Sequence, residues 1–185
     1  MEKIQNRLNK LTQIIKNAQF KSLNGLGNEI PFYIFDYQPQ SELLIREYIE
    51  EIGGSTKFDL KIKKIDLYEV LIEILNNKDY LEKVFKMEKN LGLDSLEKAL
   101  KPILKSENLI SIIKTKGDGA ELIVLYGVGK VFPLLRSHTI LNNLQHVFGS
   151  TPVLMFFPGN YNRTELQLFS RFKDDNYYRA FKLID

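Results

Sequence analysis

The segment Leu122-Ile-Val-Leu-Tyr126 runs directly into Gly127-Val-Gly-Lys130, and a second apolar run follows as Pro152-Val-Leu-Met-Phe-Phe157, closed by Pro158-Gly-Asn-Tyr161. Short apolar runs without alternation are typical of strands that are buried on both faces. The residues between the two runs, from about Phe132 to Phe148, have the spacing of a helix. Strand, helix and strand in this order predict an α/β fold with a mostly parallel sheet, and ligands and partners usually dock at the carboxyl edge of such a sheet.

The N-terminal half continues the alternation of helices and strands. Residues 1–20 predict an amphipathic helix, and residues 31–37 predict a second buried strand, with Asp36 near its end. Residues 41–52 predict a helix that Gly53-Gly54 ends. Residues 58–67 alternate apolar side chains with lysines, which is typical of a strand near the edge of a sheet.

The remaining segments are less regular. Residues 57–116 read as a mostly helical insert, with helical spacing at 68–77 and over 79–104 and no clear preference at 106–116. The segment 79–104 is predicted to break at Asn90-Leu-Gly92 and to end near Pro102. Strand-like segments at 166–169 and 179–184 complete the chain. We therefore expect the whole of residues 1–185 to form a single α/β domain, with helices that flank a mostly parallel central sheet.

Composition narrows the class of protein. A chain of 185 residues with 44% hydrophobic composition is long enough for one domain with a real core and too short for two. Zero cysteines and two histidines leave poor material for a zinc site, so we expect no cofactor, and any metal would be held by carboxylates. No apolar stretch approaches the ~20 residues of a membrane span, and no signal-peptide region precedes the first helix. The sequence predicts a cytoplasmic protein without membrane contact.

Basic residues gather in one stretch although the net charge is only +3. Between Lys57 and Lys64, Asp59 is the only acid beside four lysines: Lys57, Lys61, Lys63 and Lys64. Such a patch could bind the phosphates of DNA, or it could be the solvated edge of a strand. Asp36 together with Asp59-Leu-Lys61 also loosely resembles the carboxylates and lysine of a metal-dependent nuclease. The DNA-binding and the nuclease-like interpretations both stay open.

The loop Gly127-Val-Gly-Lys130 resembles a phosphate-binding loop, but its spacing is wrong. A Walker A loop needs a glycine where Val124 stands and a Ser or Thr where Val131 stands, and the dinucleotide motif needs a glycine in place of Phe132. We therefore interpret Gly127 and Gly129 as residues of a turn. The strand-to-helix edge could still dock a partner or an anion through Lys130, Arg136, His138 and Asn142. His138 shares the apolar side of the helix, so a core histidine is favoured over a catalytic one.

Two further segments are candidate interaction surfaces. The stretch Asp174-Asp-Asn-Tyr-Tyr-Arg-Ala-Phe181 is rich in residues found at interface hot spots, and it offers Asp174, Asp175, Tyr177, Tyr178 and Arg179. A capped turn whose tyrosines pack on the body would look the same. The first helix carries an apolar stripe, which either packs on the protein's own sheet or forms a dimer seam: Ile4, Leu8, Leu11 and Ile15.

Several of these stretches together resemble the BrxB family, the small component of bacterial BREX phage-defence systems. The matching stretches are Gly25–Tyr37, Leu125–Thr139 with Leu141–Gln145, Phe157–Tyr161 and Asp174–Phe181, and they leave about Lys57–Lys116 unmatched in detail. The resemblance implies a cytoplasmic protein encoded beside a methyltransferase, a large ATPase and a phosphatase-like PglZ protein, with PglZ as its likeliest direct partner. It transfers no catalytic residues. The order of strand, helix and strand also resembles a degenerate P-loop-type core.

Our leading hypothesis is therefore a non-catalytic adaptor that joins the components of a phage-defence complex. The family resemblance and the lack of a complete catalytic motif in the sequence motivate it. The alternative is a DNA-binding or nuclease-like component that uses the Lys57–Lys64 patch with Asp36, Asp59 and Lys61. A homodimer through the first helix is a separate hypothesis.

Overall fold

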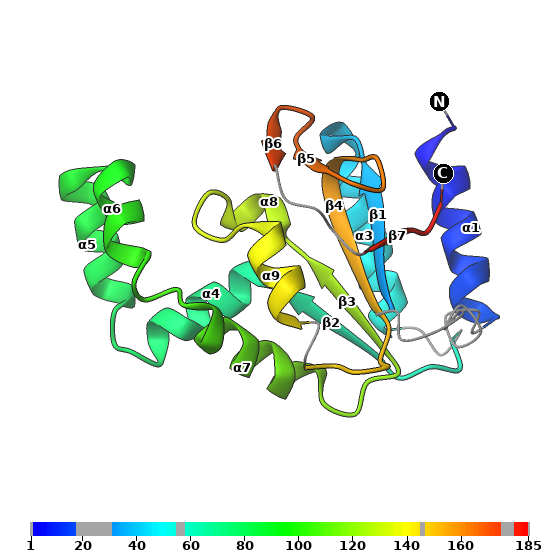
Figure 1. Ribbon diagram of the computed structural model, residues 1–185, viewed down its shortest axis with the longest axis horizontal. Coiled ribbons are helices and arrows are strands. Elements are labelled where there is room, and N and C mark those ends of the chain that lie inside the picture. The colour runs from blue at the N-terminus through cyan, green and yellow to red at the C-terminus, as the bar shows by residue number, and fades with distance from the viewer. Residues whose placement is uncertain (1, 18–30, 55–57, 145–146, 175–179, 185) are drawn as a thin grey trace.

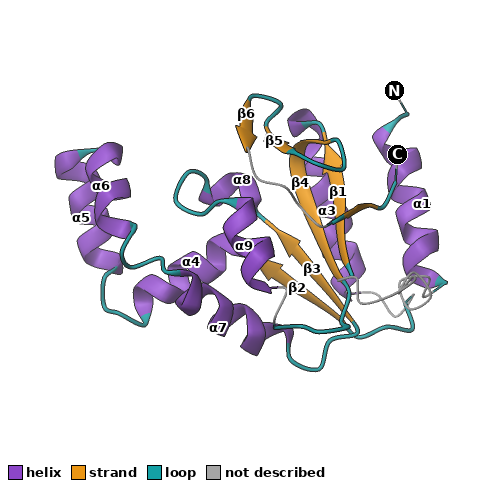
Figure 2. Ribbon diagram, viewed as in Figure 1, coloured by secondary structure: helices purple, strands orange, loops and turns teal. Residues whose placement is uncertain are grey.

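The computed structural model describes residues 2–17, 31–54, 58–144, 147–174 and 180–184, and it has a mixed α/β fold (Figure 1). A central sheet is flanked by helices on both faces, and two further helices extend away from the body at one end (Figure 2). This arrangement confirms the predicted fold class.

The central sheet is parallel throughout its main path. Its strands lie in the order β2-β3-β4-β1-β7. They are β1 (Phe32–Tyr37), β2 (Ile62–Asp66), β3 (Leu122–Tyr126), β4 (Val153–Tyr161) and β7 (Phe181–Lys182). All six residues of β1 are buried, as expected of a strand covered on both faces. β2 lies at the edge of this path, as its alternating lysines predicted.

Helices cover the two faces of the sheet unequally. On one face lie α1 (Ile4–Lys16) and α3 (Glu42–Gly54), which the 3₁₀ turn η1 (Pro39–Ser41) precedes. The other face carries most of the core. Its helices are α4 (Leu67–Asn76), α7 (Ser106–Gly117), α8 (Val128–Val131) and α9 (Ser137–Leu144). Between α4 and α7, the helices α5 (Leu81–Leu91) and α6 (Leu93–Leu100) form a hairpin that extends from the body, here called the arm.

The path of the chain explains this division. From β1 the chain crosses to the edge strand β2 through α3, and it then returns through β3 to β4, which lies beside β1. Right-handed crossovers that run in opposite directions place their helices on opposite faces. β1 and β4 are therefore the neighbouring strands where the direction of winding changes. In open α/β sheets, the carboxyl ends of such strands are a common binding site.

Two sequence predictions about the C-terminal half were wrong in detail. The helix predicted over 132–148 is two helices, α8 and α9, because Pro133 holds Phe132 in an extended conformation (φ −72°, ψ 138°) between them. By contrast, the break predicted at Asn90-Leu-Gly92 within 79–104 is confirmed, since Gly92, whose φ is +76°, lies between α5 and α6.

β4 does not end at Pro158 but continues to Tyr161, because this extension pairs with an antiparallel hairpin. The hairpin consists of β5 (Leu166–Leu168) and β6 (Phe172–Asp174), and the sequence did not predict β6. Residues 106–116, which showed no preference in the sequence, belong to α7.

Candidate functional site

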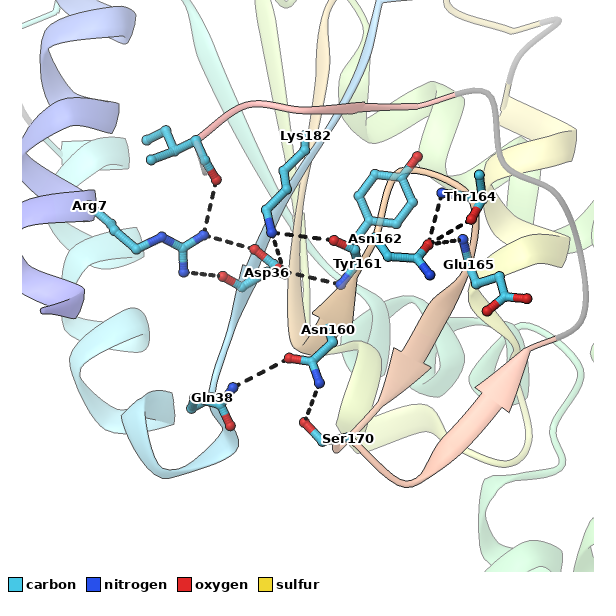
Figure 3. Close-up of polar contacts among 11 residues, drawn as sticks. Arg7, Asp36, Gln38, Asn160, Tyr161, Asn162, Thr164, Glu165, Ser170 and Lys182 are labelled. Carbon is cyan, nitrogen blue, oxygen red and sulfur yellow. Dashed lines mark hydrogen bonds and ion pairs between the residues drawn. The ribbon is translucent and has the colours of Figure 1, made fainter. Parts of the chain in front are cut away.

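An ion-pair cluster closes the carboxyl ends of β1 and β4 (Figure 3). Asp36 accepts a 2.8 Å hydrogen bond at Oδ1 from Arg7 of α1, and its Oδ2 lies 3.1 Å from Nζ of Lys182 in β7. The same Oδ2 accepts a 3.0 Å bond from the backbone N–H of Tyr161. Arg7 also donates to the backbone oxygens of Asp36 (2.6 Å) and Ile184 (3.2 Å). We call Arg7, Asp36, Tyr161 and Lys182 the sheet clamp.

The sheet clamp joins both ends of the chain to the centre of the sheet. Asp36 is 6% exposed, and a buried carboxylate is tolerated only where it is paired and hydrogen-bonded. Here one carboxylate meets two cations and a backbone donor. A cavity of about 280 Å³ opens beside the clamp, between α1, η1 and the end of β4. The charged groups of the clamp pair with one another, although Nε of Arg7 is buried with no hydrogen-bond partner among the described residues. We therefore expect the clamp to act mainly as a structural element.

The structure does not assemble the nuclease arrangement. Asp36 lies near the carboxyl end of β1, whereas Lys61 immediately precedes β2 at its amino end, and β3 and β4 lie between these parallel strands. Asp59 is exposed in the loop before β2. Asp36 is thus at the opposite edge of the sheet from the other two residues. Across the part of the chain that the structure describes, no group of three or more His, Asp or Glu side chains could hold a metal ion.

The basic patch is partly neutralised. Lys64 pairs with Glu50 of α3 at 2.6 Å, Lys61 is exposed, and Lys63 is half-buried on β2. Lys57 lies outside the described residues. The described lysines of the patch therefore lie on β2 or just before it, and Lys64 among them has an internal partner. The binding of the patch to DNA stays a prediction.

The Gly127 loop joins the carboxyl ends of β3 and β2. Gly127 adopts the left-handed conformation (φ +79°), and a Cβ on it would lie 2.3 Å from Oδ1 of Asp66. That oxygen caps α4 by accepting a 2.9 Å bond from the N–H of Tyr68, and Oδ2 binds Lys130 at 2.5 Å. The prediction of a turn at Gly127 is confirmed.

Two neighbours of this turn show how closely it is packed. Burial, with smaller contributions from Asp66 and nearby glutamates, raises the pKa of Tyr126 to about 12. Gly129 packs against the ring of Phe169, because a Cβ there would lie 2.8 Å from Cζ. Since Lys130 is held by the buried Asp66, it is not free to bind a phosphate as the lysine of a P-loop does.

The other residues predicted at this edge lie in or just before α9. Arg136 is exposed just before α9, and Asn142 is exposed within it. His138 also belongs to α9, but its side chain lies outside the described part. Asp174 is the last residue of β6, and its side chain also lies outside the described part. The whole of Asp175, Tyr177, Tyr178 and Arg179 lies outside the described residues. The candidate interface in 174–181 therefore stays a prediction.

The apolar stripe of α1 packs within the chain. Leu8, Leu11 and Ile15 are buried in the core on the α3 side of the sheet, and Ile4 packs against its margin. A dimer seam would need these side chains exposed. The structure thus favours packing on the protein's own sheet, and it gives no support to a dimer through this stripe.

Sequence reasoning missed an apolar groove between the arm and α4. The groove encloses about 450 Å³ and is lined by Leu71 and Leu75 of α4, by Phe85 of α5, by Leu93 and Leu96 of α6 and by the 132–134 loop. We call it the arm groove. α5 has no buried residue, and Phe85 and Leu93 are 55% and 70% exposed. The available signal was weak, since apolar residues within charged helices look alike whether they face a core or a partner.

These features define an α/β protein in which internal ion pairs occupy the carboxyl edge of the sheet. An apolar groove lies between its arm and α4. Among its described helices, none is long and apolar enough to cross a membrane.

Comparisons with known proteins give the family. A family model described as "BREX protein BrxB" matches residues 63–183, which include most of the segment left unmatched by the sequence resemblance. A BREX protein BrxB from Bacillus cereus (strain H3081.97) is 47% identical over 191 residues, 100% of both chains. A BREX protein BrxB from Escherichia coli O9:H4 (strain HS) is 36% identical over 180 residues, 96% of this chain and 90% of that one. The chain belongs to the BrxB family, a component of BREX systems.

Proposed function

We propose that this protein is a non-catalytic adaptor in a BREX-type phage-defence complex, and that it binds the phosphatase-like PglZ component. In this proposal the protein acts in the cytoplasm by holding a partner rather than by reacting with a substrate. Family membership supports the system, and the arm groove is the observation that carries the adaptor role.

The arm groove has the composition of a surface that a protein partner covers. Its walls are mostly leucine, isoleucine, valine and phenylalanine side chains, and several of them stay exposed at the rim. Contiguous exposed apolar surface is uncommon on monomeric proteins and marks interaction sites. Within the arm, α6 buries Leu96 and Leu100 in the core. By contrast, α5 buries no residue, and Phe85 and Leu93 remain exposed. Packing on a partner would give these side chains the burial that the fold does not provide.

The charges around the groove indicate the chemistry of the partner. Glu88, Asp94 and Glu97 all line it. Lys130 lines it as well, but this cation is already paired with Asp66. Complementary potentials across an interface steer association and exclude other partners. The partner segment is therefore expected to present an apolar face flanked by Lys or Arg, as an amphipathic helix in a groove does.

The state of the buried carboxylates supports the non-catalytic part of the proposal. Asp36 is held by Arg7 and Lys182, and Asp66 is held by Lys130 and the N–H of Tyr68. A general base or nucleophile needs a lone pair that can reach the reacting atom of a substrate. Both carboxylates instead stabilise the carboxyl edge of the sheet.

Co-purification tests the proposal directly. In cells that express the whole system, the tagged protein should recover PglZ at low salt. Phe85→Ser and Leu93→Ser should reduce this recovery at least tenfold, because truncating an interface anchor costs about 2 kcal/mol or more. Leu43→Ser is the matched control, since Leu43 is 72% exposed on α3 of the opposite face. The control should recover PglZ like the unchanged protein.

Three results would contradict parts of the proposal. Failure to recover any system component at low salt would refute the adaptor role. Equal recovery by the groove variants would refute the arm groove as the binding surface. Cleavage of duplex DNA by the purified protein with Mg²⁺ would refute the non-catalytic role, and salt-sensitive binding to DNA without cleavage would favour the alternative in which the Lys57–Lys64 patch contacts phosphates.

A further inference from the structure

A third cavity lies between the β5–β6 hairpin, which is at the top of Figure 1, and the loop between α8 and α9. It encloses about 290 Å³ and is separate from the sheet clamp and from the arm groove. Its polar lining is Arg136, Ser137, Arg171 and Lys173, and its apolar lining includes Phe132 and Phe172. We call it the hairpin pocket.

The hairpin pocket is cationic. Two guanidinium groups and one ammonium group line it, and they come from three segments of the chain: the start of α9, the hairpin turn and β6. Lys173 has a carboxylate partner, since its Nζ lies 2.9 Å from Oε1 of Glu165. Arg136 and Arg171 have no hydrogen-bond or ion-pair partner among the residues that the structure describes. Paired arginines are well suited to phosphate, because each can donate two parallel hydrogen bonds.

Ser137 adds a hydroxyl to the lining. The residue is only 7% exposed, and within the described part of the chain its hydroxyl has no hydrogen bond. The oxygen is not fully enclosed, so it can donate a hydrogen bond to a ligand in the cavity that it lines. Ser137 is also the first residue of α9, where the helix dipole favours an anion.

Aromatic rings lie beside these groups. The rings of Phe132 and Phe172 are 4.9 Å apart between centroids, and Phe172 remains 47% exposed. A flat exposed ring next to cations suits a ligand with a planar apolar body and an anionic end. The volume lies just below the usual range of ligand sites, which begins at about 300 Å³, so it fits one small ligand rather than a dinucleotide.

We propose that the hairpin pocket binds a single nucleotide unit. Arg136, Arg171 and Ser137 hold its phosphate, and its base packs against Phe172. The same chemistry is offered by a free mononucleotide and by one unit of a single-stranded oligonucleotide. This site is independent of the adaptor role, because it shares only Phe132 with the arm groove.

Calorimetric titration with AMP tests the proposal, with inorganic phosphate, adenosine and a short oligothymidine as further probes. AMP should bind more tightly than phosphate or adenosine, since each of these offers only half of the contacts. Arg136→Gln and Arg171→Gln should each weaken AMP binding about tenfold or more, because each removes a charge-assisted hydrogen bond. Ser137→Ala should weaken it several-fold. Phe172→Ala should weaken AMP binding but not phosphate binding.

Arg46→Gln is the matched control, because this arginine is exposed on α3 and pairs only with Glu42 in the described chain. It should bind AMP like the unchanged protein. Tighter binding of oligothymidine than of AMP, lost in the arginine variants, would identify nucleic acid as the source of the nucleotide. The proposal would be overturned if neither AMP nor oligothymidine bound. It would also be overturned if Arg136→Gln and Arg171→Gln left the binding of AMP unchanged. Phosphate that binds as tightly as AMP would overturn the role of Phe172.

Discussion

The sheet clamp and the arm groove use their side chains in opposite ways. In the clamp, Arg7, Asp36 and Lys182 are polar groups that find their partners within the chain. In the arm, Phe85 and Leu93 are apolar groups that the chain leaves exposed. The clamp lies at the edge of the sheet where α/β proteins usually bind ligands, whereas the arm extends from the body (Figure 1). The clamp thus uses polar side chains inside the fold, whereas the arm leaves apolar side chains available to a partner.

The energetic reason is general. A buried charge that is paired and hydrogen-bonded belongs to the fold. Removing one member of the pair leaves the charge of the other member buried and uncompensated. An exposed apolar side chain contributes little to the fold and gains free energy only when another surface covers it. Substitutions in the two regions should therefore separate stability from binding.

Asp36→Asn should have the largest effect on stability. The substitution keeps the shape of the side chain but leaves Arg7 and Lys182 as neighbouring cations without a carboxylate. Removing one partner of a buried ion pair typically costs 3–5 kcal/mol, so we expect a loss of about 3 kcal/mol in the free energy of unfolding. Urea denaturation followed by circular dichroism measures it.

The matched control is the exposed pair of Arg46 and Glu42 on α3. Arg46→Gln should change the free energy of unfolding by less than about 0.5 kcal/mol, because water already solvates both groups. If Asp36→Asn were as mild as this control, the sheet clamp would not be a structural element, and Asp36 would again be a candidate for catalysis.

Gly127→Ala should have the next largest effect. A left-handed conformation costs a residue with a Cβ about 1–2 kcal/mol, and here the new Cβ would also lie 2.3 Å from Oδ1 of Asp66. Moving Asp66 would weaken its bonds to Lys130 and to the N–H of Tyr68. We expect a total loss of about 3 kcal/mol or slightly less, in the same urea experiment.

Gly119→Ala isolates the contact from the conformation. Gly119 also has a positive φ, +66°, at the third position of the turn that the N–H of Ala120 closes on the carbonyl of Gly117. Its Cβ position is near only the flexible end of Lys61, 3.1 Å away. It should therefore lose only the conformational part, about 1–2 kcal/mol. Equal losses at the two glycines would show that Asp66 yields freely and that the link between β2 and β3 is loose.

The fold was predictable from the sequence wherever local pattern decides structure. The apolar runs at 32–37, 122–126 and 153–157 are strands, and the Gly127 turn follows from local chemistry alone. The break between α8 and α9 was also local, since Pro133 excludes the helix that the apolar spacing suggested. The hairpin β5–β6 was harder, because its short strands form only by pairing with the extension of β4.

The candidate sites depend on contacts that no local pattern contains. Asp36 was recognisable as a polar residue near a strand end, but Arg7 lies 29 residues away and Ile184, whose carbonyl Arg7 also binds, lies 177 residues from Arg7. The cationic hairpin pocket likewise combines Arg136 with Arg171 and Lys173 from a later hairpin. Periodicity alone did not distinguish the exposed Phe85 from the buried Leu75, because both recur at helical spacing.

Phe85→Ser should have the smallest effect on stability. Comparing it with a buried residue of the same groove shows whether the exposed side chains of the arm serve the core or a partner. Leu75 of α4 also lines the arm groove, but it is 1% exposed, so Leu75→Ala should cost about 2–5 kcal/mol. Phe85→Ser should change the free energy of unfolding by less than about 0.5 kcal/mol, because its ring already contacts water. If both variants were equally unstable, the arm would belong to the core and its exposed side chains would not indicate a partner. A stable Phe85→Ser protein that no longer recovers PglZ would instead place its contribution in binding.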